Sequence, residues 1–450
     1  MTDLRRLLDD GKPIFGTDGV RGEAGTELTA DLAMDIGRAA GSYLRGGPVL
    51  VGQDTRRSGS MLSAALQAGF HSVGIDTVDV GVLPSGGISF LTASSGATMG
   101  AVVSASHNPA ADNGIKLLAS RGTKLADEVE RQIESRMRAS GRQIATGSEI
   151  GYRRQNTEGY RQYLEHLLGA AKYSLNGVSL AIDCANGSAY KAAPELFKRL
   201  NADVRVFHAE PNGNNINDGC GATSPEFIAK HGGGRIGLAF DGDADRLIAV
   251  DEDGVVANGD VIMAIVARHL KEQGRLTKNL VVATVMSNLG FRKALAEADI
   301  ELVETPVGDR YVMEALIQRK GLLGGEQSGH IIFTDLSSTG DGLLTAVQLL
   351  NVVAGTGKEL RQLRAEAMTE YPQVLVNVRV ARGMDVAEME ELWEEVAAVE
   401  DELGEEGRVL VRPSGTEPLI RIMVEAPSQT QASRYADRLA AVTKTAMARE

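Results

Sequence analysis

Three aspartates at alternate positions form the most chemically specific segment of the sequence. Asp241, Asp243 and Asp245 stand in Phe240-Asp-Gly-Asp-Ala-Asp-Arg246. Carboxylate clusters of this density suit a hard divalent cation such as Mg²⁺ or Ca²⁺. A turn that binds nothing is the plainest alternative. The third carboxylate and the adjacent Arg246 favour a metal together with an anionic ligand.

A calcium-binding EF-hand is a second interpretation of the same segment. Aspartates occupy positions 1, 3 and 5 of such a loop, and Glu252 would be position 12. However, position 6 is Arg246, where the sharp turn of an EF-hand needs glycine. The flanking residues 235–240 and 247–250 also have the pattern of strands rather than helices, which makes the EF-hand the weaker hypothesis.

A second polar loop, Ser104-Ala-Ser-His-Asn-Pro109, offers a nucleophile in Ser106 beside His107. The dipeptide is not a Ser-His-Asp triad, because side chains adjacent in sequence do not generally face each other. Alone the dipeptide is a weak signal, and a turn built from Ser-His-Asn-Pro is the plainer explanation of the segment. Ten residues beyond Ser106, Lys116 could act as an acid, a base or a phosphate ligand, or it could be an ordinary surface lysine.

A third loop, Arg412-Pro-Ser-Gly-Thr-Glu-Pro418, has the composition of an anion site. Backbone N–H groups and hydroxyls of Ser414-Gly415-Thr416 can turn toward one point, and Arg412 adds a planar donor fork, with Arg421 just beyond. A plain glycine-proline turn is the alternative. The sequence contains no GxxxxGK[ST] and no GxGxxG that opens a helix, so neither a P-loop nor a dinucleotide site is supported.

Two further loops are less specific. In Gly324-Gly-Glu-Gln-Ser-Gly-His330, Glu326, Ser328 and His330 alternate, and Glu326 and Ser328 could hydrogen-bond two sugar hydroxyls or simply close a turn. Phe15-Gly-Thr-Asp-Gly-Val-Arg-Gly22 places Arg21 in a glycine-rich loop, which says little in isolation.

The elements that must position these loops follow a strand–loop–helix order. Apolar runs of strand length end in Gly, Ser, Asn or Asp and precede amphipathic stretches such as 58–73, which predicts βαβ units and parallel sheets. Ligands of such sheets gather at the carboxyl ends of strands, where the polar loops stand. The predicted strands are 48–52, 101–103, 178–182, 235–240 and 280–285.

The C-terminal stretch predicts a different, smaller α+β domain. A strand over 374–380 precedes an acidic helix over 385–403, then strands at 408–411 and 419–424 and a helix to about 447. One side of the acidic helix carries the apolar residues Val386, Met389, Trp393, Val396 and Leu403. Its acidic side is expected to be a solvated face rather than a cation-binding tail.

Length and charge limit the function classes. The 450 residues carry a formal net charge of −13, which argues against coating nucleic acid or an anionic membrane. Two cysteines and the lack of a signal-length or membrane-length apolar run predict a soluble protein of the cytoplasm. Clusters of predicted strands and the polar stretches between them predict domains at 1–150, 151–255, 256–370 and 371–450.

Taken together, the loops SASHNP, DGDADR, GEQSGH and RPSGTEP, in this order and at these separations, resemble the α-D-phosphohexomutase superfamily along essentially the whole chain. The resemblance implies an α/β architecture of four domains around a central cleft, three related α/β domains and a smaller C-terminal α+β domain. FGTDGVRG and GEQSGH are most similar to the members that act on glucosamine phosphates. The alternative is phosphoglucomutase or phosphomannomutase activity by the same mechanism.

The resemblance also implies a reaction and its cofactors. Glucosamine 6-phosphate and glucosamine 1-phosphate would interconvert through a phosphoserine at Ser106 and a sugar 1,6-bisphosphate, which also primes the enzyme, in a step toward UDP-N-acetylglucosamine and hence peptidoglycan precursors. One Mg²⁺ per active site would be held by a phosphoserine oxygen together with Asp241, Asp243 and Asp245. The partner is a small hexosamine phosphate, with no nucleic acid or membrane, and a homodimer is compatible with the resemblance.

Residue roles follow from the same resemblance. Lys116 is the expected acid or base, His107 and His330 are helpers, Arg246 steadies developing charge and Arg21 contacts the phosphoserine region. Glu326 and Ser328 would hold sugar hydroxyls in both orientations of the intermediate. The phosphate that is not transferred would be held by Arg412, Ser414, Gly415, Thr416 and Arg421. Gly308 and Asp309 belong to a sugar-facing loop, where Asp309 is either the partner of the substrate's 2-ammonium group or a surface-turn aspartate.

Overall fold

The computed structural model describes residues 4–16, 18–44, 46–139, 144–380, 386–413 and 419–447. Internal contacts divide the chain into two compact units. Unit 1 comprises Met1–Met286 and Ile300–Ala367, and unit 2 comprises Ser287–Asp299 and Met368–Glu450. No helix among the described residues is long and apolar enough to cross a membrane.

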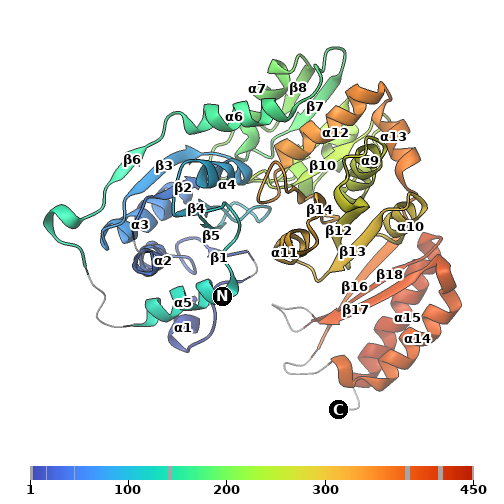
Figure 1. Ribbon diagram of the computed structural model, residues 1–450. Helices are drawn as coiled ribbons and strands as arrows, with labels where there is room; N and C mark the ends of the chain where they lie inside the picture. Colours follow the sequence, from blue (N-terminus) through green and yellow to red (C-terminus); the bar gives the residue numbers. More distant parts are fainter. Residues whose placement is uncertain are drawn as a thin grey trace. The chain divides into compact units, whose positions relative to one another are not determined.

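Unit 1 contains three mixed sheets that follow one another along the chain (Figure 1). The first has the order β1-β5-β4-β2-β3-β6, the second β11-β10-β9-β7-β8 and the third β13-β12-β14-β15. Their strands are β1 Val20–Glu23, β2 Val49–Gln53, β3 Thr77–Val82, β4 Met99–Val103, β5 Asp112–Ala119, β6 Arg153–Gln155, β7 Ser179–Asp183, β8 Asp203–Phe207, β9 Ile236–Phe240, β10 Leu247–Val250, β11 Val256–Ala257, β12 Leu280–Thr284, β13 Glu301–Thr305, β14 Leu323–Gly325 and β15 Ile331–Phe333.

The three sheets share one topology. In each, a first strand (β2, β7 or β12) pairs in parallel with a second strand (β3, β8 or β13) and a third strand (β4, β9 or β14). The third strand then pairs antiparallel with a fourth, β5, β10 or β15. The α/β fold class is therefore confirmed, with one correction. The sheets are mixed rather than parallel, because β4, β9 and β14 are each followed by an antiparallel strand instead of a helix.

Helices pack against these sheets. The helices of unit 1 are α1 Leu4–Asp9, α2 Ala30–Tyr43, α3 Gly59–His71, α4 Ser85–Ser94, α5 Asp127–Arg138, α6 Gly159–Ala170, α7 Ala189–Arg199, α8 Glu226–His231, α9 Gly259–Glu272, α11 Asp309–Arg319, α12 Gly342–Thr356 and α13 Leu360–Ala367. The predicted helix over 58–73 corresponds to α3. The polar side chains stand in the loops at the ends of the strands. The apolar faces of the helices cover the surfaces of the sheets.

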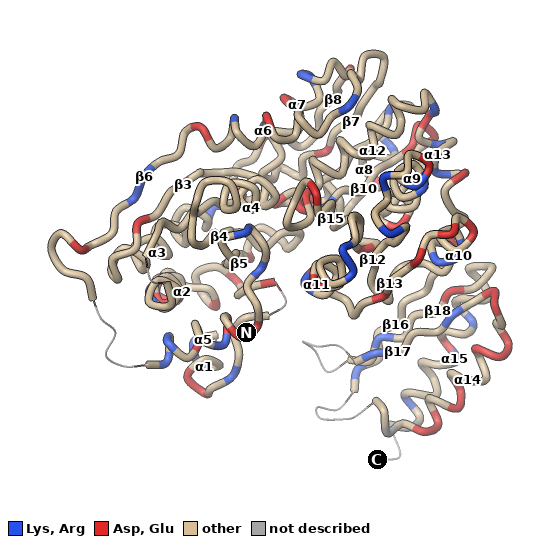
Figure 2. Tube along the Cα trace, viewed as in Figure 1, with Lys and Arg blue, Asp and Glu red and all other residues tan. Residues whose placement is uncertain are grey.

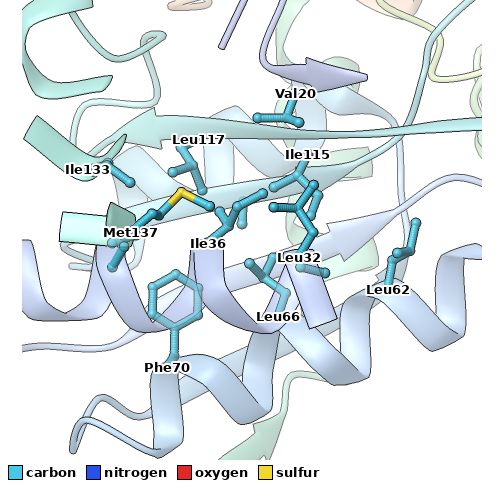
Figure 3. Close-up of a cluster of buried hydrophobic side chains, with 14 of the residues drawn as sticks. Val20, Leu32, Ile36, Leu62, Leu66, Phe70, Ile115, Leu117, Ile133 and Met137 are labelled. Carbon is cyan, nitrogen blue, oxygen red and sulfur yellow. The ribbon is translucent and has the colours of Figure 1, made fainter. Parts of the chain in front are cut away.

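The core below the first sheet shows this packing. Ile36 of α2 and Leu66 and Phe70 of α3 lie against Ile115 and Leu117 of β5 (Figure 3). All five side chains are buried, and apolar burial of this kind stabilises a fold by roughly 25 cal/mol per Å². The close approach of the two helices requires glycine, because a Cβ at Gly37 would lie 2.2 Å from the Leu66 carbonyl oxygen.

Unit 2 has the predicted α+β order. Its three-stranded antiparallel sheet has the order β16-β18-β17, formed by β16 Gln373–Arg379, β17 Arg408–Pro413 and β18 Leu419–Glu425. The helices are α10 Leu289–Glu297, α14 Glu390–Leu403 and α15 Gln429–Met447. The predicted strand boundaries agree closely with these, whereas the acidic helix begins later than predicted. A short 3₁₀ turn, Val386–Glu388, precedes it, and residue 385 lies outside the described residues.

Acidic residues follow one another along α14 (red in Figure 2), and most of them are exposed: Glu390, Glu391, Glu394, Glu400, Asp401 and Glu402. Val386, Met389, Val396 and Leu403 are buried as predicted. Trp393 is not: it is 40% exposed, and its indole N–H donates to the Val386 carbonyl at 2.8 Å. Leu392 and Val399 fill the core instead.

Candidate active site

Ser106 lies in the loop between β4 and β5, in a tightly constrained backbone. Its φ of 50° is in the left-handed region that residues other than glycine rarely adopt, and the residue is fully buried. The Oγ donates a 2.6 Å hydrogen bond to Asp241 Oδ2. His107 Nδ1 lies 3.4 Å from the same Oγ. The general expectation that adjacent side chains face apart is therefore wrong for this pair.

Two side chains that the sequence did not single out hold this loop. Arg56, just past β2, donates to the carbonyl oxygens of Ser106 and Asn108 at 2.9 and 2.8 Å. Its charge is paired with Asp54 at 2.9 Å, and both side chains are fully buried. Asn217, which lies between β8 and the 3₁₀ turn Gly221–Thr223, donates its side-chain Nδ2–H to the Ser106 carbonyl at 2.8 Å. In the sequence, Arg56 could have been found from its position in the polar loop that follows the predicted strand 48–52. No sequence feature pointed to Asn217.

The aspartate loop connects β9 to β10. Donor oxygens of Asp241, Asp243 and Asp245 all lie within 4.8 Å of one another, and all three residues are buried. The flanking β9 and β10 pair as an antiparallel hairpin, so the loop is not an EF-hand. Gly242 permits its contact with the serine loop, because a Cβ there would lie 2.5 Å from the Ser106 carbonyl oxygen.

The aspartate cluster fits a divalent cation. Asp243 Oδ1 and Asp245 Oδ1 are buried and accept no hydrogen bond from the described residues. Burial, together with the negative charges of Asp245 and Asp243, raises the pKa of Asp241 far above its usual range. A cation would relieve both costs, and an all-oxygen donor set is the one that Mg²⁺ prefers. Asp241, Asp243 and Asp245 would hold the ion, next to the Ser106 hydroxyl.

Lys116 is not at the surface. It stands on β5 opposite Val102 of β4, and its side chain is 6% exposed. The Nζ lies 2.9 Å from Asp243 Oδ2 and 3.4 Å from Asp245 Oδ2. Burial alone would lower the pKa of Lys116, but Asp18, Asp243 and Asp245 raise it well above its usual value. Lys116 is therefore a charged donor within the aspartate cluster.

Asp243 has the opposite electrostatic surroundings from Asp241. Burial would raise its pKa, but the Lys116 ammonium and the hydrogen bond from Ser85 lower it below its usual value. The Ser85 hydroxyl donates to Asp243 Oδ2 at 2.7 Å. Asp243 is thus ionised and oriented before any ion binds.

The remaining predicted basic residues of unit 1 lie around this cluster. Arg246 donates its backbone N–H to Asp241 Oδ1 at 3.2 Å. Arg21 contacts Asp18 and lies 3.5 Å from Asn108 Oδ1. Burial, followed by the charges of Arg246 and Arg21, lowers the pKa of His107 to about 4, so its imidazole is neutral near pH 7.

The loop Gly324–His330 forms the hairpin turn between β14 and β15. Glu326 Oε1 accepts the Gly308 N–H at 3.0 Å, and Ser328 Oγ donates to Glu326 Oε2 at 3.3 Å. The loop touches the start of β10 through the Gly329 carbonyl, which accepts the Leu247 N–H at 3.1 Å. With φ 92° and a Cβ position 2.2 Å from the Leu247 carbonyl oxygen, residue 329 must be glycine.

Asp309 begins α11 and is mostly buried rather than being a surface-turn residue. Its Oδ1 lies 2.7 Å from Lys124 Nζ, and its Oδ2 lies 3.5 Å from His330 Nε2. The Lys124 ammonium also contacts Asp18. This contact links Asp309 to the lysine and arginine residues that lie beside the aspartate cluster. Neither Lys124 nor Asp18 was a sequence candidate, although Asp18 lies inside Phe15–Gly22.

In unit 2, Arg412 and Arg421 are directly opposite each other on β17 and β18. Like charges at such positions repel, so the pair is a natural binding point for an anion. Burial and the charge of Arg421 lower the pKa of Arg412. Ser414, Gly415 and Thr416, the predicted anion loop, lie outside the described residues.

The structure thus brings together three of the four loops that carry the family resemblance. Those around Ser106, Asp241 and Glu326 each connect the third and fourth strands of their own sheet, so the three occupy the same topological position. A buried hydroxyl, a cluster of three carboxylates that could hold a cation, a buried ammonium and a carboxylate–hydroxyl pair are groups of the kind that phosphoryl transfer on a sugar requires.

Comparison with known proteins agrees with this assembly of loops. Four family models match in order: phosphoglucomutase/phosphomannomutase domain I at residues 12–143, domain II at 159–254, domain III at 258–371 and the C-terminal domain at 375–442. The chain is 48% identical to a phosphoglucosamine mutase of Anoxybacillus flavithermus, over 96% of this chain and 98% of that protein. It is 47% identical to one of Bacillus subtilis, over 97% and 99%.

Solved structures give the same result for the fold. A phosphoglucomutase/phosphomannomutase family protein of Burkholderia thailandensis superposes with a TM-score of 0.81 at 28% identity, covering 96% of this chain and 97% of that one. The N-acetylphosphoglucosamine mutase of Aspergillus fumigatus, solved with GlcNAc-6P and magnesium, has a TM-score of 0.70 at 20% identity, covering 99% and 100%. The chain therefore belongs to the phosphoglucomutase/phosphomannomutase family, the α-D-phosphohexomutases, and within it to the group of the phosphoglucosamine mutases.

Proposed function

We propose that the chain interconverts glucosamine 6-phosphate and glucosamine 1-phosphate through a phosphoserine at Ser106. The observation that carries the proposal is the 2.6 Å hydrogen bond from Ser106 Oγ to Asp241, inside a cluster of three buried carboxylates. The names of relatives at 47–49% identity support the sugar. Supply of UDP-N-acetylglucosamine synthesis, a cytoplasmic location and a homodimer remain predictions.

The reaction balances as two phosphoryl transfers. The phosphoryl group on Ser106 Oγ passes to the sugar 1-hydroxyl, so the Oγ–P bond breaks, a sugar O–P bond forms, and the sugar 1,6-bisphosphate results. After this intermediate turns around, its 6-phosphoryl group returns to Ser106. A sugar 1,6-bisphosphate also primes the unphosphorylated enzyme. In each direction one hydroxyl loses a proton and the other oxygen gains one.

Magnesium is the proposed cofactor, held by Asp241, Asp243, Asp245 and an oxygen of phosphorylated Ser106. When bound, the ion withdraws charge from the transferring phosphoryl group. The donor set suits this ion, and the Aspergillus fumigatus relative was solved with magnesium and GlcNAc-6P. One ion per active site is proposed.

The protonation states of Lys116 and His107 suggest different roles for them. Lys116 keeps its proton between Asp243 and Asp245, so it is proposed to donate hydrogen bonds to phosphoryl oxygens. Of the predicted acid and base roles, only that of the acid is compatible with a protonated Lys116. His107 is neutral and 3.4 Å from Ser106 Oγ, where it can accept a hydroxyl proton. Arg246 and Arg21 are proposed to steady the developing negative charge.

Substrate binding is assigned to the remaining groups. Glu326 and Ser328 are proposed to hold sugar hydroxyls in both orientations, since their carboxylate and hydroxyl are already aligned by a 3.3 Å hydrogen bond. His330 and Gly308 support that loop. Arg412 and Arg421, together with Ser414-Gly415-Thr416, are proposed to bind the phosphate that is not transferred.

Asp309 is proposed to select the amino sugar through the substrate's 2-ammonium group. Its carboxylate already attracts one ammonium, that of Lys124 at 2.7 Å, so a second can share it. The test measures kcat/KM on glucosamine, glucose and mannose 6-phosphates with Mg²⁺ and a trace of sugar bisphosphate. Wild type should prefer glucosamine 6-phosphate, and Asp309→Asn should lose more on this substrate than on glucose 6-phosphate.

The matched control is Asp253→Asn, which removes the same charge from an exposed residue. A wild-type preference for glucose or mannose 6-phosphate would replace the proposed sugar by the alternative, phosphoglucomutase or phosphomannomutase activity. Equal losses on both sugars in Asp309→Asn would remove its role in selection and leave the mutase reaction untouched.

A further inference from the structure

A second cluster of potential metal ligands lies near the carboxyl ends of strands β7 and β8 in the second sheet. Asp183 is the last residue of β7, and His208 follows β8 directly, with the two strands parallel and adjacent (Figure 1). Cys220 precedes the 3₁₀ turn Gly221–Thr223. The mutase reaction as proposed above uses none of these three residues.

Their donor atoms converge. One atom each from Asp183, His208 and Cys220 lies within 4.8 Å of the other two, and Asp183 Oδ2 is 3.1 Å from His208 Nδ1. Asp183 and Cys220 are fully buried, while the His208 side chain is 27% exposed. The remaining Asp183 oxygen, Oδ1, accepts the Ala185 N–H at 2.9 Å. Apart from this contact with each other, Asp183 Oδ2 and His208 Nδ1 have no hydrogen-bond partner among the described residues.

The chemistry of this donor set differs from that of the aspartate loop. A thiolate, an imidazole and a carboxylate suit Zn²⁺ and similar thiophilic cations, whereas Mg²⁺ prefers oxygen alone. We propose that Asp183, His208 and Cys220 form a second metal site that binds a thiophilic divalent cation such as Zn²⁺. Solvent completes the coordination on the exposed side of His208, and the Cys220 thiol releases its proton to solvent as the metal–sulfur bond forms.

The surrounding backbone holds the three ligands in place. Ala185 and His208 have positive φ values of 51° and 48°, and the His208 carbonyl accepts the Asn186 N–H at 2.6 Å. The His208 ring meets Phe227 edge-on, with centroids 4.4 Å apart. A residue held in an unfavourable conformation by its neighbours is a recognised feature of sites that must be preorganised.

The site connects to the serine loop through Asn217. The Asn217 N–H donates to the Ala185 carbonyl at 3.0 Å, and its side chain donates to the Ser106 carbonyl at 2.8 Å. Asn217 also has a positive φ, 58°, and stands three residues before Cys220. A cation held by Asp183 and Cys220 would therefore join the segment that contains Ala185 to the segment that contains Asn217. It would stabilise the chain by binding only its folded form.

Cobalt is the probe for this site, because Co²⁺ replaces Zn²⁺ and a cobalt–thiolate bond has a charge-transfer absorption in the near ultraviolet. Chelator-treated full-length protein, kept reduced, is titrated with Co²⁺ in the presence of excess Mg²⁺. Wild type should develop the thiolate band at one Co²⁺ per chain and lose it when Zn²⁺ is added. Cys220→Ser should abolish the band, while Cys184→Ser, the matched control for the chain's other cysteine, should keep it.

Two further variants separate this site from the aspartate cluster. His208→Ala, at the partly exposed ligand, should weaken Co²⁺ binding by roughly 100-fold or more without the folding risk of a buried substitution. Asp243→Asn should leave the band unchanged, whatever it does to turnover, so the result does not depend on the mutase reaction. Absence of the band in wild type, or its persistence in folded Cys220→Ser, would overturn the second metal site.

Discussion

Ser106 Oγ lies 2.6 Å from Asp241 Oδ2, although 135 positions separate the two residues along the chain. A group attached to Oγ would therefore lie beside the three carboxylates. The hydroxyl is held there by the left-handed backbone of Ser106 and by the side chains of Arg56 and Asn217, which donate hydrogen bonds to the Ser106 carbonyl. Phosphorylation and cation binding are thus expected to depend on each other.

Replacing the proposed nucleophile should abolish phosphorylation. After incubation with a sugar 1,6-bisphosphate, intact-mass measurement should show one phosphoryl group on wild type and none on Ser106→Ala, with turnover falling by at least about 1,000-fold. Ser104→Ala removes a neighbouring hydroxyl, which donates to Asp54 Oδ2 at 2.6 Å, and should still be phosphorylated. Turnover that survives unchanged in Ser106→Ala would rule out the phosphoserine mechanism.

Removing the buried ammonium should affect cation affinity and turnover in opposite directions. In Lys116→Met, Asp243 and Asp245 lose a competing positive charge at 2.9 and 3.4 Å, so Mg²⁺ should bind roughly 10-fold tighter. Turnover should nevertheless fall on the order of 100-fold or more, because the proton donor is gone. Calorimetric Mg²⁺ titration and steady-state rates measure the two effects.

Lys124→Met is the nearby control, since Lys124 is another lysine near the site and pairs with Asp18 and Asp309. Its Mg²⁺ affinity should remain close to that of wild type. An unchanged affinity in Lys116→Met would mean that the ammonium does not compete with the ion.

Arg56 is expected to act through the serine loop rather than on the substrate. Its guanidinium contacts the carbonyl oxygens of four loop residues, Ser106, Asn108, Pro109 and Asp112, a geometry that a lysine cannot reproduce. Arg56→Lys should lower kcat by roughly 10- to 100-fold through misplacement of Ser106, with KM little changed. The exposed Arg57→Lys is the matched control. A rise in KM with kcat unchanged would instead assign Arg56 to substrate binding.

Asp341 should make stability depend on pH. It caps α12 by accepting the Leu344 N–H, and burial raises its pKa from 3.8 to about 6. Between these values the folded chain keeps a proton that the unfolded chain releases, so the free energy of unfolding falls as pH rises. Asp341→Asn has no such carboxyl, so this loss is absent. Its free energy of unfolding, relative to that of wild type, should therefore rise by up to about 3 kcal/mol between pH 4 and 6.

Denaturation midpoints of the two proteins across that pH range test the point. The difference between Asp341→Asn and wild type should grow with pH and level off above about 6. Parallel curves for Asp341→Asn would mean that this carboxyl does not titrate in the folded protein as stated.

Local sequence was sufficient for much of the fold. Apolar strand runs, such as the one that became β2, and the amphipathic pattern of α3 follow from local periodicity, so they could be predicted within a few residues. The order of strands in a sheet is different. Whether β4 is followed by a helix or returns as the antiparallel β5 depends on long-range pairing, which local periodicity does not encode.

The exposed position of Trp393 has a similar cause. It has the same spacing along α14 as residues that are buried, yet Leu392 and Val399 fill the core of unit 2. An amphipathic pattern defines a face only to within one or two positions, and packing against β17 and α15 selects among them.

The sequence by itself determined the chemistry that is available: a serine beside a histidine, three alternating aspartates, a Glu-x-Ser pair and an arginine-rich turn. These residue types and their order also carried the family resemblance. Charge state could not be derived in the same way. Lys116 is a buried, paired ammonium and His107 a neutral imidazole, because burial and neighbouring charges, which exist only in the folded chain, decide their pKa values.

Only the tertiary structure decided which loops meet. The loops around Ser106, Asp241 and Glu326 arise from the same strand-to-strand turn in three sheets of one topology, although the sequence has no visible repeat. It also revealed Arg56 and Asn217 behind Ser106, and the convergence of Asp183, His208 and Cys220. The physical reason is that donor atoms need separations of a few ångströms, which only packing can set for residues far apart in the chain.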